Sequence, residues 1–329
     1  MSRVNPFASI YLQQNDSSLT PEQSINKRKF PIAMDIELTN HCNFRCRMCN
    51  TGSGKLQRSK GFMSDYTWDR LMGEISETKM GLRFTGCGEP MLHPKFLAYI
   101  EQAKKKEFLV HITTNASLIN TEIMDRLITM HVDSIKFSFQ GVDRETYNEM
   151  RLGGNYDRLF EAIKKFYVKR GGKLLPYFHL ATTLTDETPE QIESFRKTFS
   201  HYVDYLSVGI TLLEHFDPDE ISSEFARKKY TKLKLYQEKR ISEAPHFVSC
   251  PEIFDKLNIW WDGGVTPCCN DYEGEMFVGN IHENSLMELW NCEKLRTYRE
   301  ILSKRNFDAI PLCRKCVDYM KLHSDNNNE

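Results

Sequence analysis

The chain has 329 residues and a nearly balanced charge, with 44 Lys and Arg against 45 Asp and Glu, and a formal net charge of -1 at pH 7. This balance argues against a global field that would attract nucleic acid or an anionic membrane. No apolar run approaches the roughly 20 residues that cross a bilayer, and residues 1–18 lack the pattern of a signal peptide. We therefore expect a cytoplasmic protein whose partners include neither nucleic acid nor a membrane.

Residues 31 to about 215 alternate short β-rich runs with helical patterns. The helical segments carry apolar residues at i, i+3 and i+4, and Ser64 is a good N-cap for the first of them. Six runs have strand character: 32–38, 82–85, 109–114, 134–139, 176–184 and 205–210. The alternation predicts βα units around a parallel sheet, with functional groups at the carboxyl ends of the strands. Six units fit either an open, partial barrel or a doubly wound sheet.

The rest of the chain has a different texture. Residues 1–30 form an N-terminal extension, and residues 216–244 form a charged helical linker. From residue 245 to 329, short strands and turns precede one helix, predicted over 285–302, that contains Cys292. This pattern predicts a small C-terminal α+β module with the pair Trp260 and Trp261 in its core.

The cysteines fall into two sets. The first is C-x3-C-x2-C, and the second lies in the C-terminal module, with Cys87 alone between them: Cys42, Cys46 and Cys49, then Cys250, Cys268, Cys269, Cys292, Cys313 and Cys316. In a reducing cytoplasm, such clusters favour metal ligands or redox groups over disulfides. The first spacing is not that of a zinc ribbon. Three thiolates can instead hold three irons of a 4Fe-4S cube and leave the fourth iron free.

The segment "CNFRCRMC", residues 42–49, resembles the cluster motif of the radical S-adenosylmethionine (radical SAM) superfamily. The resemblance implies that Cys42, Cys46 and Cys49 hold a 4Fe-4S cluster whose open iron binds S-adenosylmethionine. The reduced cluster would cleave S-adenosylmethionine to methionine and a 5'-deoxyadenosyl radical. A flavodoxin- or ferredoxin-type protein would donate the electron, and Met48 would lie near the adenine.

Three further segments resemble elements of the same family: "GCGEP" (86–90), "TNA" (114–116) and "SFQG" (138–141), the last followed by an arginine. The resemblance implies contacts to S-adenosylmethionine from Gly86, Gly88, Glu89, Asn115, Ser138 and Arg151. Glu89 would face the ammonium group, and Arg151 the carboxylate or ribose. Cys87 and Gln140 depart from the glycine and aspartate that are usual in these elements.

The C-terminal set resembles the SPASM domain, or its shortened twitch form, over residues 250–320. This implies one auxiliary 4Fe-4S cluster held by Cys250, Cys268, Cys313 and Cys316, with Cys269 as the alternative to its neighbour Cys268. A zinc site formed by four cysteines is the structural alternative. A thiol near a substrate radical can donate a hydrogen atom, and Cys87 and Cys269 are the candidates for that catalytic role.

The resemblance implies an α/β fold: a partial (β/α)6 TIM-like barrel over 31–215 and a small α+β iron-sulfur domain over 245–329. About 31 residues precede the first strand, too few for a peptide-recognition domain. We therefore expect a small-molecule substrate, such as a sugar or aminocyclitol, undergoing dehydrogenation, epimerisation or dehydration. The alternatives are a peptide or protein maturase or activase, and a non-catalytic iron-sulfur electron-transfer protein.

Overall fold

The six predicted strands are all present in the computed structural model, which describes residues 3–10, 28–243, 250–314 and 316. Their bounds are β1 (Ala33–Ile36), β3 (Gly81–Phe84), β4 (Leu109–Thr114), β5 (Ser134–Ser138), β7 (Tyr177–Leu184) and β8 (Tyr205–Ile210). Each run was recognisable because buried β-branched and aromatic residues recur in it between helical segments.

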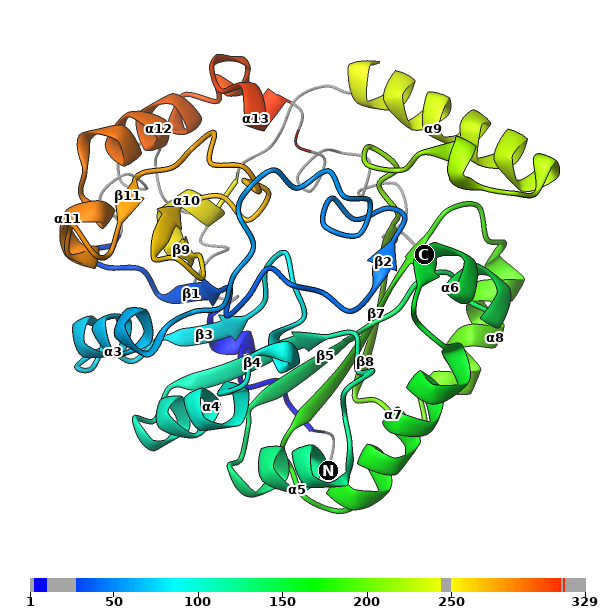
Figure 1. Cartoon of the computed structure of the whole chain (residues 1–329), viewed down its shortest axis with the longest axis horizontal. Helices are drawn as coiled ribbons and strands as arrows, with labels where there is room; N and C mark the ends of the chain where they lie inside the picture. Colours follow the sequence, from blue (N-terminus) through cyan, green and yellow to red (C-terminus); the bar gives the residue numbers. More distant parts are fainter. Residues whose placement is uncertain (1–2, 11–27, 244–249, 315, 317–329) are drawn as a thin grey trace.

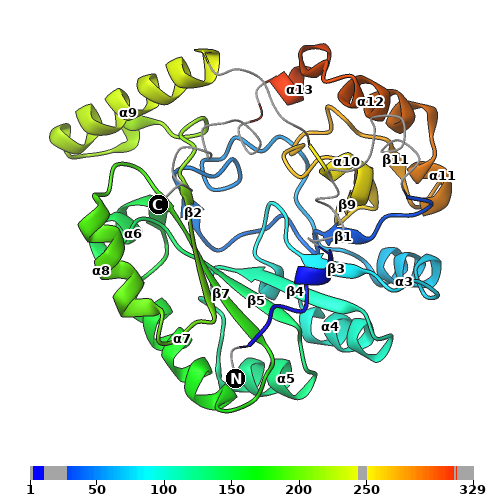
Figure 2. The same cartoon turned by 180° about the vertical axis from the view of Figure 1, so that it is seen from behind.

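The predicted helices cover the outer side of the curved sheet (Figures 1 and 2). They are α3 (Asp65–Glu74), α4 (Phe96–Lys105), α5 (Thr121–Thr129), α7 (Tyr156–Arg170) and α8 (Pro189–Phe199), with the shorter η1 (Pro90–Leu92) and α6 (Arg144–Met150) between them. Ser64 is the N-cap of α3, as predicted, and its hydroxyl accepts a hydrogen bond from Thr67 N at 3.1 Å.

A single nine-stranded sheet runs through the protein in the order β11-β10-β9-β1-β3-β4-β5-β7-β8. The pairs from β9 to β8 are parallel, and the last strands, β10 (Gly264–Thr266) and β11 (Gly279–Asn280), are antiparallel. The α/β partial-barrel prediction is therefore confirmed. The C-terminal module extends the sheet, because β9 (Lys256–Ile259) pairs in register with β1.

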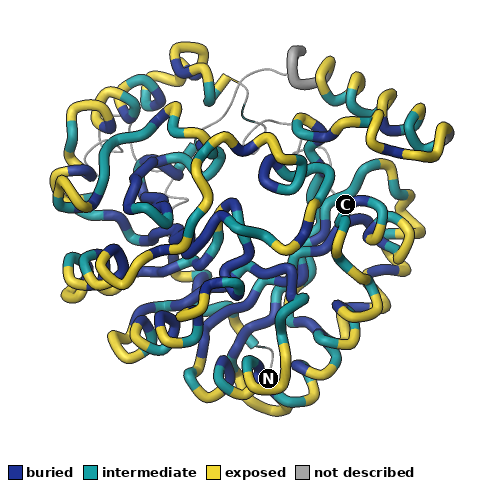
Figure 3. Tube along the Cα trace, viewed as in Figure 1, coloured by how far each residue is buried: buried dark blue, intermediate teal, exposed yellow. Residues whose placement is uncertain are grey.

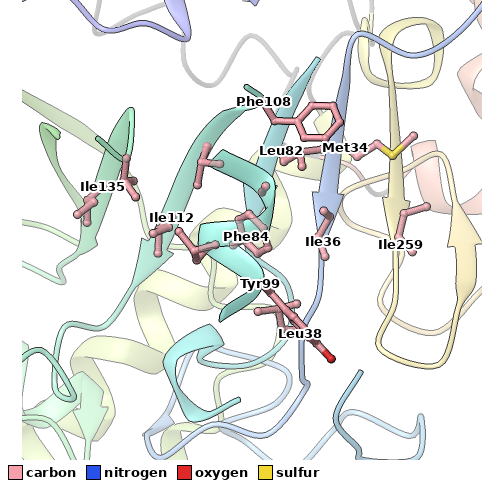
Figure 4. Packing of buried hydrophobic residues seen from close by; sticks show 14 of the residues in the cluster. Met34, Ile36, Leu38, Leu82, Phe84, Tyr99, Phe108, Ile112, Ile135 and Ile259 are labelled. Carbon is pink, nitrogen blue, oxygen red and sulfur yellow. The ribbon is translucent and has the colours of Figure 1, made fainter. Parts of the chain in front are cut away.

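The two faces of the sheet differ in polarity because side chains alternate along each strand. Met34, Ile36, Leu82 and Phe84 belong to the main apolar core (Figure 4), and the outer faces of the helices are exposed (Figure 3). The residues between them are polar, and Asp35 forms an ion pair with Arg83, its register partner. Burial opposes ionisation of Asp35, but the Arg83 and Lys256 charges hold its pKa below its ordinary value. The inner face is therefore polar and charged.

The prediction of one helix over 285–302 was wrong. Two helices, α11 (Leu286–Trp290) and α12 (Glu293–Ser303), occupy this segment. Cys292 has extended backbone angles, with φ -63° and ψ 153°, and its sulfur accepts a hydrogen bond from Leu295 N at 3.4 Å. The chain breaks here because Cys292 caps the second helix instead of continuing the first.

Apart from α9, the remaining elements are short. They are β2 (Arg45–Cys46), β6 (Arg151–Leu152), η2 (Pro218–Glu220), α9 (Glu224–Glu243), α10 (Glu252–Asp255), η3 (Phe307–Ala309) and α13 (Pro311–Arg314). Helix α9 lies in the predicted linker, and its Gln237 amide donates to Thr211 O at 2.6 Å. Among the helices of the described residues, none combines the length and apolar character needed to span a membrane.

Candidate functional site

The first cysteine set lies on the loop that follows β1. Cys46 is in β2 and is the register partner of Arg151 in β6, so the loop is pinned to the chain that follows β5. Cys49 N donates to Cys46 O at 3.1 Å, and Phe44 N donates to the sulfur of Cys42 at 3.5 Å. The three thiols are half-buried and unoxidised. The three predicted cluster ligands thus lie on one folded loop, and their role as ligands stays a prediction.

Burial opposes ionisation of two of these thiols. Burial raises the pKa of Cys42, and it raises the pKa of Cys46 to about 11, although the nearby Arg151 charge lowers both. Proximity to Cys49 adds to the increase for both. Because iron binds thiolates, loading this site releases protons.

Two glycines let the cysteine loop lie against its neighbours. A Cβ on Gly52 would lie 2.4 Å from both the nitrogen and the oxygen of Cys46. A Cβ on Gly88 would lie 2.3 Å from Thr39 O and 2.4 Å from His41 O. Both contacts are with backbone, which cannot move aside cheaply. The lack of a side chain at Gly88 therefore allows the loop after β3 to pack directly against the backbone at the start of the cysteine loop. A cofactor site shared by the two loops requires this close packing.

We expect Gly88→Ala to destabilise the protein by about 1–3 kcal/mol, because the added methyl overpacks two backbone carbonyls. Denaturant unfolding of the cluster-free chain measures this. The matched control is Gly73→Ala in α3, where a Cβ would meet nothing within 4 Å. The control should stabilise by about 0.5–1 kcal/mol, since alanine is the better helix former. Equal unfolding midpoints for the two variants would contradict this prediction.

Glu89 links the end of β3 to the end of β4. Its carboxylate accepts hydrogen bonds from Asn115 N at 2.7 Å, the Thr114 hydroxyl at 2.8 Å and Met91 N at 3.2 Å. The side chain is buried, and burial raises its pKa to about 7 despite these donors. The side-chain amide of Asn115 also donates to Asn43 Oδ1 at 3.0 Å, which connects the end of β4 to the cysteine loop. The contact from Glu89 to the ammonium of S-adenosylmethionine stays a prediction.

The other predicted S-adenosylmethionine contacts lie on neighbouring strand ends. Arg151 Nη2 donates to Phe139 O at 3.0 Å, and the buried Arg151 Nε has no hydrogen-bond partner among the described residues. Ser138 is half-buried at the end of β5. Met48 packs with a small apolar cluster that contains Phe216. Their roles at the ribose, carboxylate and adenine stay predictions.

The sequence analysis missed two charged residues beside this site. Arg58 donates three hydrogen bonds to the carboxylate of Glu37, which follows β1. Arg58 also approaches the sulfur of Cys87 at 3.6 Å. The residue in the sequence that could have indicated this pair was Glu37, a charged residue near the end of a predicted strand. The thiol of Cys87 is buried, and burial raises its pKa to about 12.

The second cysteine set gathers in the C-terminal module. Cys316 N donates to Cys313 O at 3.1 Å, and burial raises the pKa of Cys313 to about 12. Burial also raises the pKa of Cys250 well above its ordinary value, and the charges of Cys269 and Cys316 add to this effect. A side-chain hydrogen bond with Cys268, together with burial, raises the pKa of Cys269 well above its ordinary value. The four predicted auxiliary ligands therefore lie with Cys269 in one region, and the hydrogen-donor role of Cys269 stays a prediction.

We expect Cys268→Ala to lower the iron content of anaerobically reconstituted protein from about eight to about four per chain. Cys269→Ala should retain about eight, because our assignment makes Cys268 the ligand. Iron and sulfide analysis of both variants tests this. Loss of half the iron from Cys269→Ala, with Cys268→Ala unaffected, would reverse the assignment.

A cavity of about 240 Å³ lies between the cysteine loop and the C-terminal module. Asn50, next to Cys49, lines it from one side, and Cys316 lines it from the other. The remaining lining residues are mostly polar or charged: Lys55, Gln57, Glu214, His215, Asn270, Tyr272, Glu273, Glu275 and Leu312. A ligand in this cavity would lie between the two cysteine sets.

The Trp260 and Trp261 side chains also belong to this boundary. Arg58 lies over the Trp260 ring at 4.0 Å from its centroid, and Trp261 Nε1 donates to Ser59 O at 3.3 Å. The prediction that the pair forms the core of the C-terminal module was therefore incomplete. Both rings contact the segment that follows the cysteine loop.

Comparison with known proteins agrees with this arrangement. Residues 36–199 match the radical SAM superfamily, and residues 250–317 match the iron-sulfur cluster-binding domain SPASM. A tungsten-containing aldehyde ferredoxin oxidoreductase cofactor-modifying protein of Pyrococcus furiosus is 23% identical over 324 residues, covering 87% of this chain and 88% of the relative. A PqqA peptide cyclase of Granulibacter bethesdensis is 32% identical over 125 residues, covering 38% of this chain and only 32% of that relative.

The fold also matches solved structures. Streptococcus suis SuiB bound to its precursor peptide SuiA has a TM-score of 0.61 at 16% identity, with 89% of this chain and 72% of that chain covered. At this identity the likeness establishes the fold alone. A domain that binds a 4Fe-4S cluster with S-adenosylmethionine is thus followed by a domain that binds auxiliary iron-sulfur, and the chain belongs to the radical SAM superfamily with a SPASM extension.

Proposed function

We propose that this radical SAM enzyme is a maturase or activase that modifies a peptide or protein substrate. When bound, the reduced cluster supplies the electron that splits S-adenosylmethionine into methionine and a 5'-deoxyadenosyl radical. The similarity to a PqqA peptide cyclase carries the proposal, and it favours the peptide alternative over the small-molecule expectation. The specific product stays open to experiment.

Each predicted site residue would have a distinct role in binding the cluster or S-adenosylmethionine. Cys42, Cys46 and Cys49 would hold the first cluster, and the backbone around Gly88 would receive the amino group of S-adenosylmethionine. Arg151, whose buried Nε has no partner within the part of the chain that the structure describes, would donate to the carboxylate or ribose. These groups would fix the reacting atoms relative to one another before the electron arrives, which lowers the entropic cost of reaction.

The arrangement of the sheet is compatible with a long substrate. Strand β8 ends the sheet on one side and β11 ends it on the other, so the barrel does not close. The cavity is lined by residues of the cysteine loop and of the C-terminal module. One residue of an extended peptide would occupy this cavity while the flanking residues pass through the open side.

We further propose that a flavodoxin- or ferredoxin-type protein delivers the electron.

The test is anaerobic reconstitution followed by incubation with S-adenosylmethionine, a reductant and a candidate peptide encoded near the gene. We expect methionine and 5'-deoxyadenosine, together with a mass change on the peptide. Absence of both small products, with both clusters shown intact, would overturn the enzyme assignment and favour an electron-transfer protein. Formation of both products without peptide modification would count against the peptide proposal.

The second candidate substrate is a small molecule. The pyrococcal relative is matched along 88% of its length, and its name describes a cofactor-modifying protein. A metabolite that gains or loses hydrogen in the same incubation, with every peptide unchanged, would favour this candidate.

A further inference from the structure

We propose that Glu37 and Arg58 are positioning residues that couple the loop 86–89 to the C-terminal module, so that docking of the module sets the affinity of this loop for S-adenosylmethionine. The inference rests on the proposed binding of S-adenosylmethionine at this loop. Neither residue belongs to the cysteine sets or to the elements that resemble the family.

Glu37 contacts the backbone of the loop 86–89. Its Oε2 accepts a hydrogen bond from Cys87 N at 3.0 Å. A Cβ on Gly86 would lie 2.8 Å from both Cβ and Cγ of Glu37, so the loop backbone rests directly on this side chain. Glu37 is only 4% exposed. A shift of its carboxylate would therefore shift the loop.

Arg58 fixes the position of that carboxylate. Its Nη1 donates to Oε1 of Glu37 at 3.0 Å, and its Nη2 donates to Oε1 at 3.1 Å and to Oε2 at 2.9 Å. Both side chains are largely buried, with exposures of 10% and 4%. The planar guanidinium matches the carboxylate in a way that a lysine ammonium cannot.

Arg58 approaches the sulfur of Cys87 in the loop at 3.6 Å, and two further contacts join it to the C-terminal module. Its Nε donates to Tyr272 O at 2.6 Å, and its guanidinium lies 4.0 Å from the centroid of the Trp260 ring. A desolvated cation over an aromatic face is attracted by the ring quadrupole. One side chain therefore contacts the module and the carboxylate that supports the loop.

The neighbours of Arg58 strengthen this docking. Gln57 N donates to both carboxylate oxygens of Glu273, at 3.0 and 3.2 Å. A Cβ on Gly61 would lie 2.4 Å from the Trp261 ring, so the segment 57–61 is in close contact with the module on both sides of Arg58. Displacement of the module would move this segment with it.

The energetic consequence is a coupling between two sites. If the module moves, Arg58 must lose contacts either with Glu37 or with the module, and a largely buried charge would be left poorly paired. Conversely, a ligand that stabilises the loop stabilises the docked module by the same free energy, because linkage is reciprocal.

The test uses the full chain with both clusters loaded, and it measures the Kd for S-adenosylmethionine by equilibrium dialysis. We expect about tenfold weaker binding for both Arg58→Ala and Glu37→Gln, within the usual range of coupling. The matched control is Arg126→Ala, which breaks the exposed Arg126–Glu101 ion pair on α5 and α4. The control should bind as the wild type does.

Two further readouts separate positioning from a loss of fold. Added guanidinium ion should restore binding to Arg58→Ala, and Arg58→Lys should bind no better than Arg58→Ala. In hydrogen exchange, S-adenosylmethionine should increase the protection of residues 256–277 in the wild type. This distant response should vanish in Glu37→Gln, an isosteric change that keeps the side-chain volume even where Arg58→Ala folds poorly.

The outcomes distinguish this inference from the proposed function. Either of two results would overturn the coupling and leave the function intact. One is wild-type affinity for S-adenosylmethionine in both Arg58→Ala and Glu37→Gln. The other is a hydrogen-exchange response of residues 256–277 in Glu37→Gln that equals the wild-type response. A wild-type protein that holds both clusters and neither binds nor cleaves S-adenosylmethionine would overturn the function and the coupling together.

Discussion

Replacement of Cys42, Cys46 and Cys49 by alanine is expected to reduce cleavage of S-adenosylmethionine to background. The three thiols are the predicted ligands of the first cluster, and their loop is pinned by the Cys46–Arg151 register and by Gly52. Without the cluster there is no iron for the cofactor to bind and no electron to split it. Chromatographic assay of methionine and 5'-deoxyadenosine under anaerobic, reducing conditions measures the loss.

The control for this experiment is Cys292→Ser. Cys292 caps α12 with its sulfur, and serine supplies a better cap at the same position. Cleavage by this variant should match the wild type. Substantial product from the triple variant, with its first cluster shown to be missing, would contradict the assignment of these ligands.

Replacement of Cys313 and Cys316 by alanine has the second largest expected effect, and it acts on a different step. Iron should fall from about eight to about four per chain, because only the auxiliary cluster is lost. Cleavage of S-adenosylmethionine should continue, since the cysteine loop and the loop 86–89 keep their own contacts. Turnover of the true substrate should stop if the auxiliary cluster accepts an electron from the substrate radical.

Two measurements on the same sample test this prediction. The yield of 5'-deoxyadenosine measures cleavage of S-adenosylmethionine, and the amount of modified substrate measures turnover. The expected pattern is cleavage without product. Normal substrate turnover in this variant would show that the auxiliary cluster is only a scaffold. Loss of cleavage as well would contradict this expectation and would show that the first site depends on the auxiliary cluster.

The candidate site was predictable from the sequence where its chemistry depends on local spacing. The cysteine loop is one such case, because three cysteines within eight residues share one short segment of chain in any fold. The glycines at 86 and 88 are another, since they occupy a turn at a predicted strand end. The break at Cys292 was missed because its periodicity continues through the cap, and only the backbone angles reveal it.

The six parallel strands, the outer helices and the two cysteine sets were predictable from the sequence, because periodicity and cysteine spacing are local properties of the chain, and the resemblance of its motifs to a known family implied the cofactor chemistry. Only the tertiary structure decided that β9 joins β1 in a single sheet and that Arg58 connects Glu37 to Trp260. These contacts join residues that are about 200 positions apart in the sequence, or that carry no motif. They follow from how the C-terminal module packs against the barrel, and no local pattern encodes that packing.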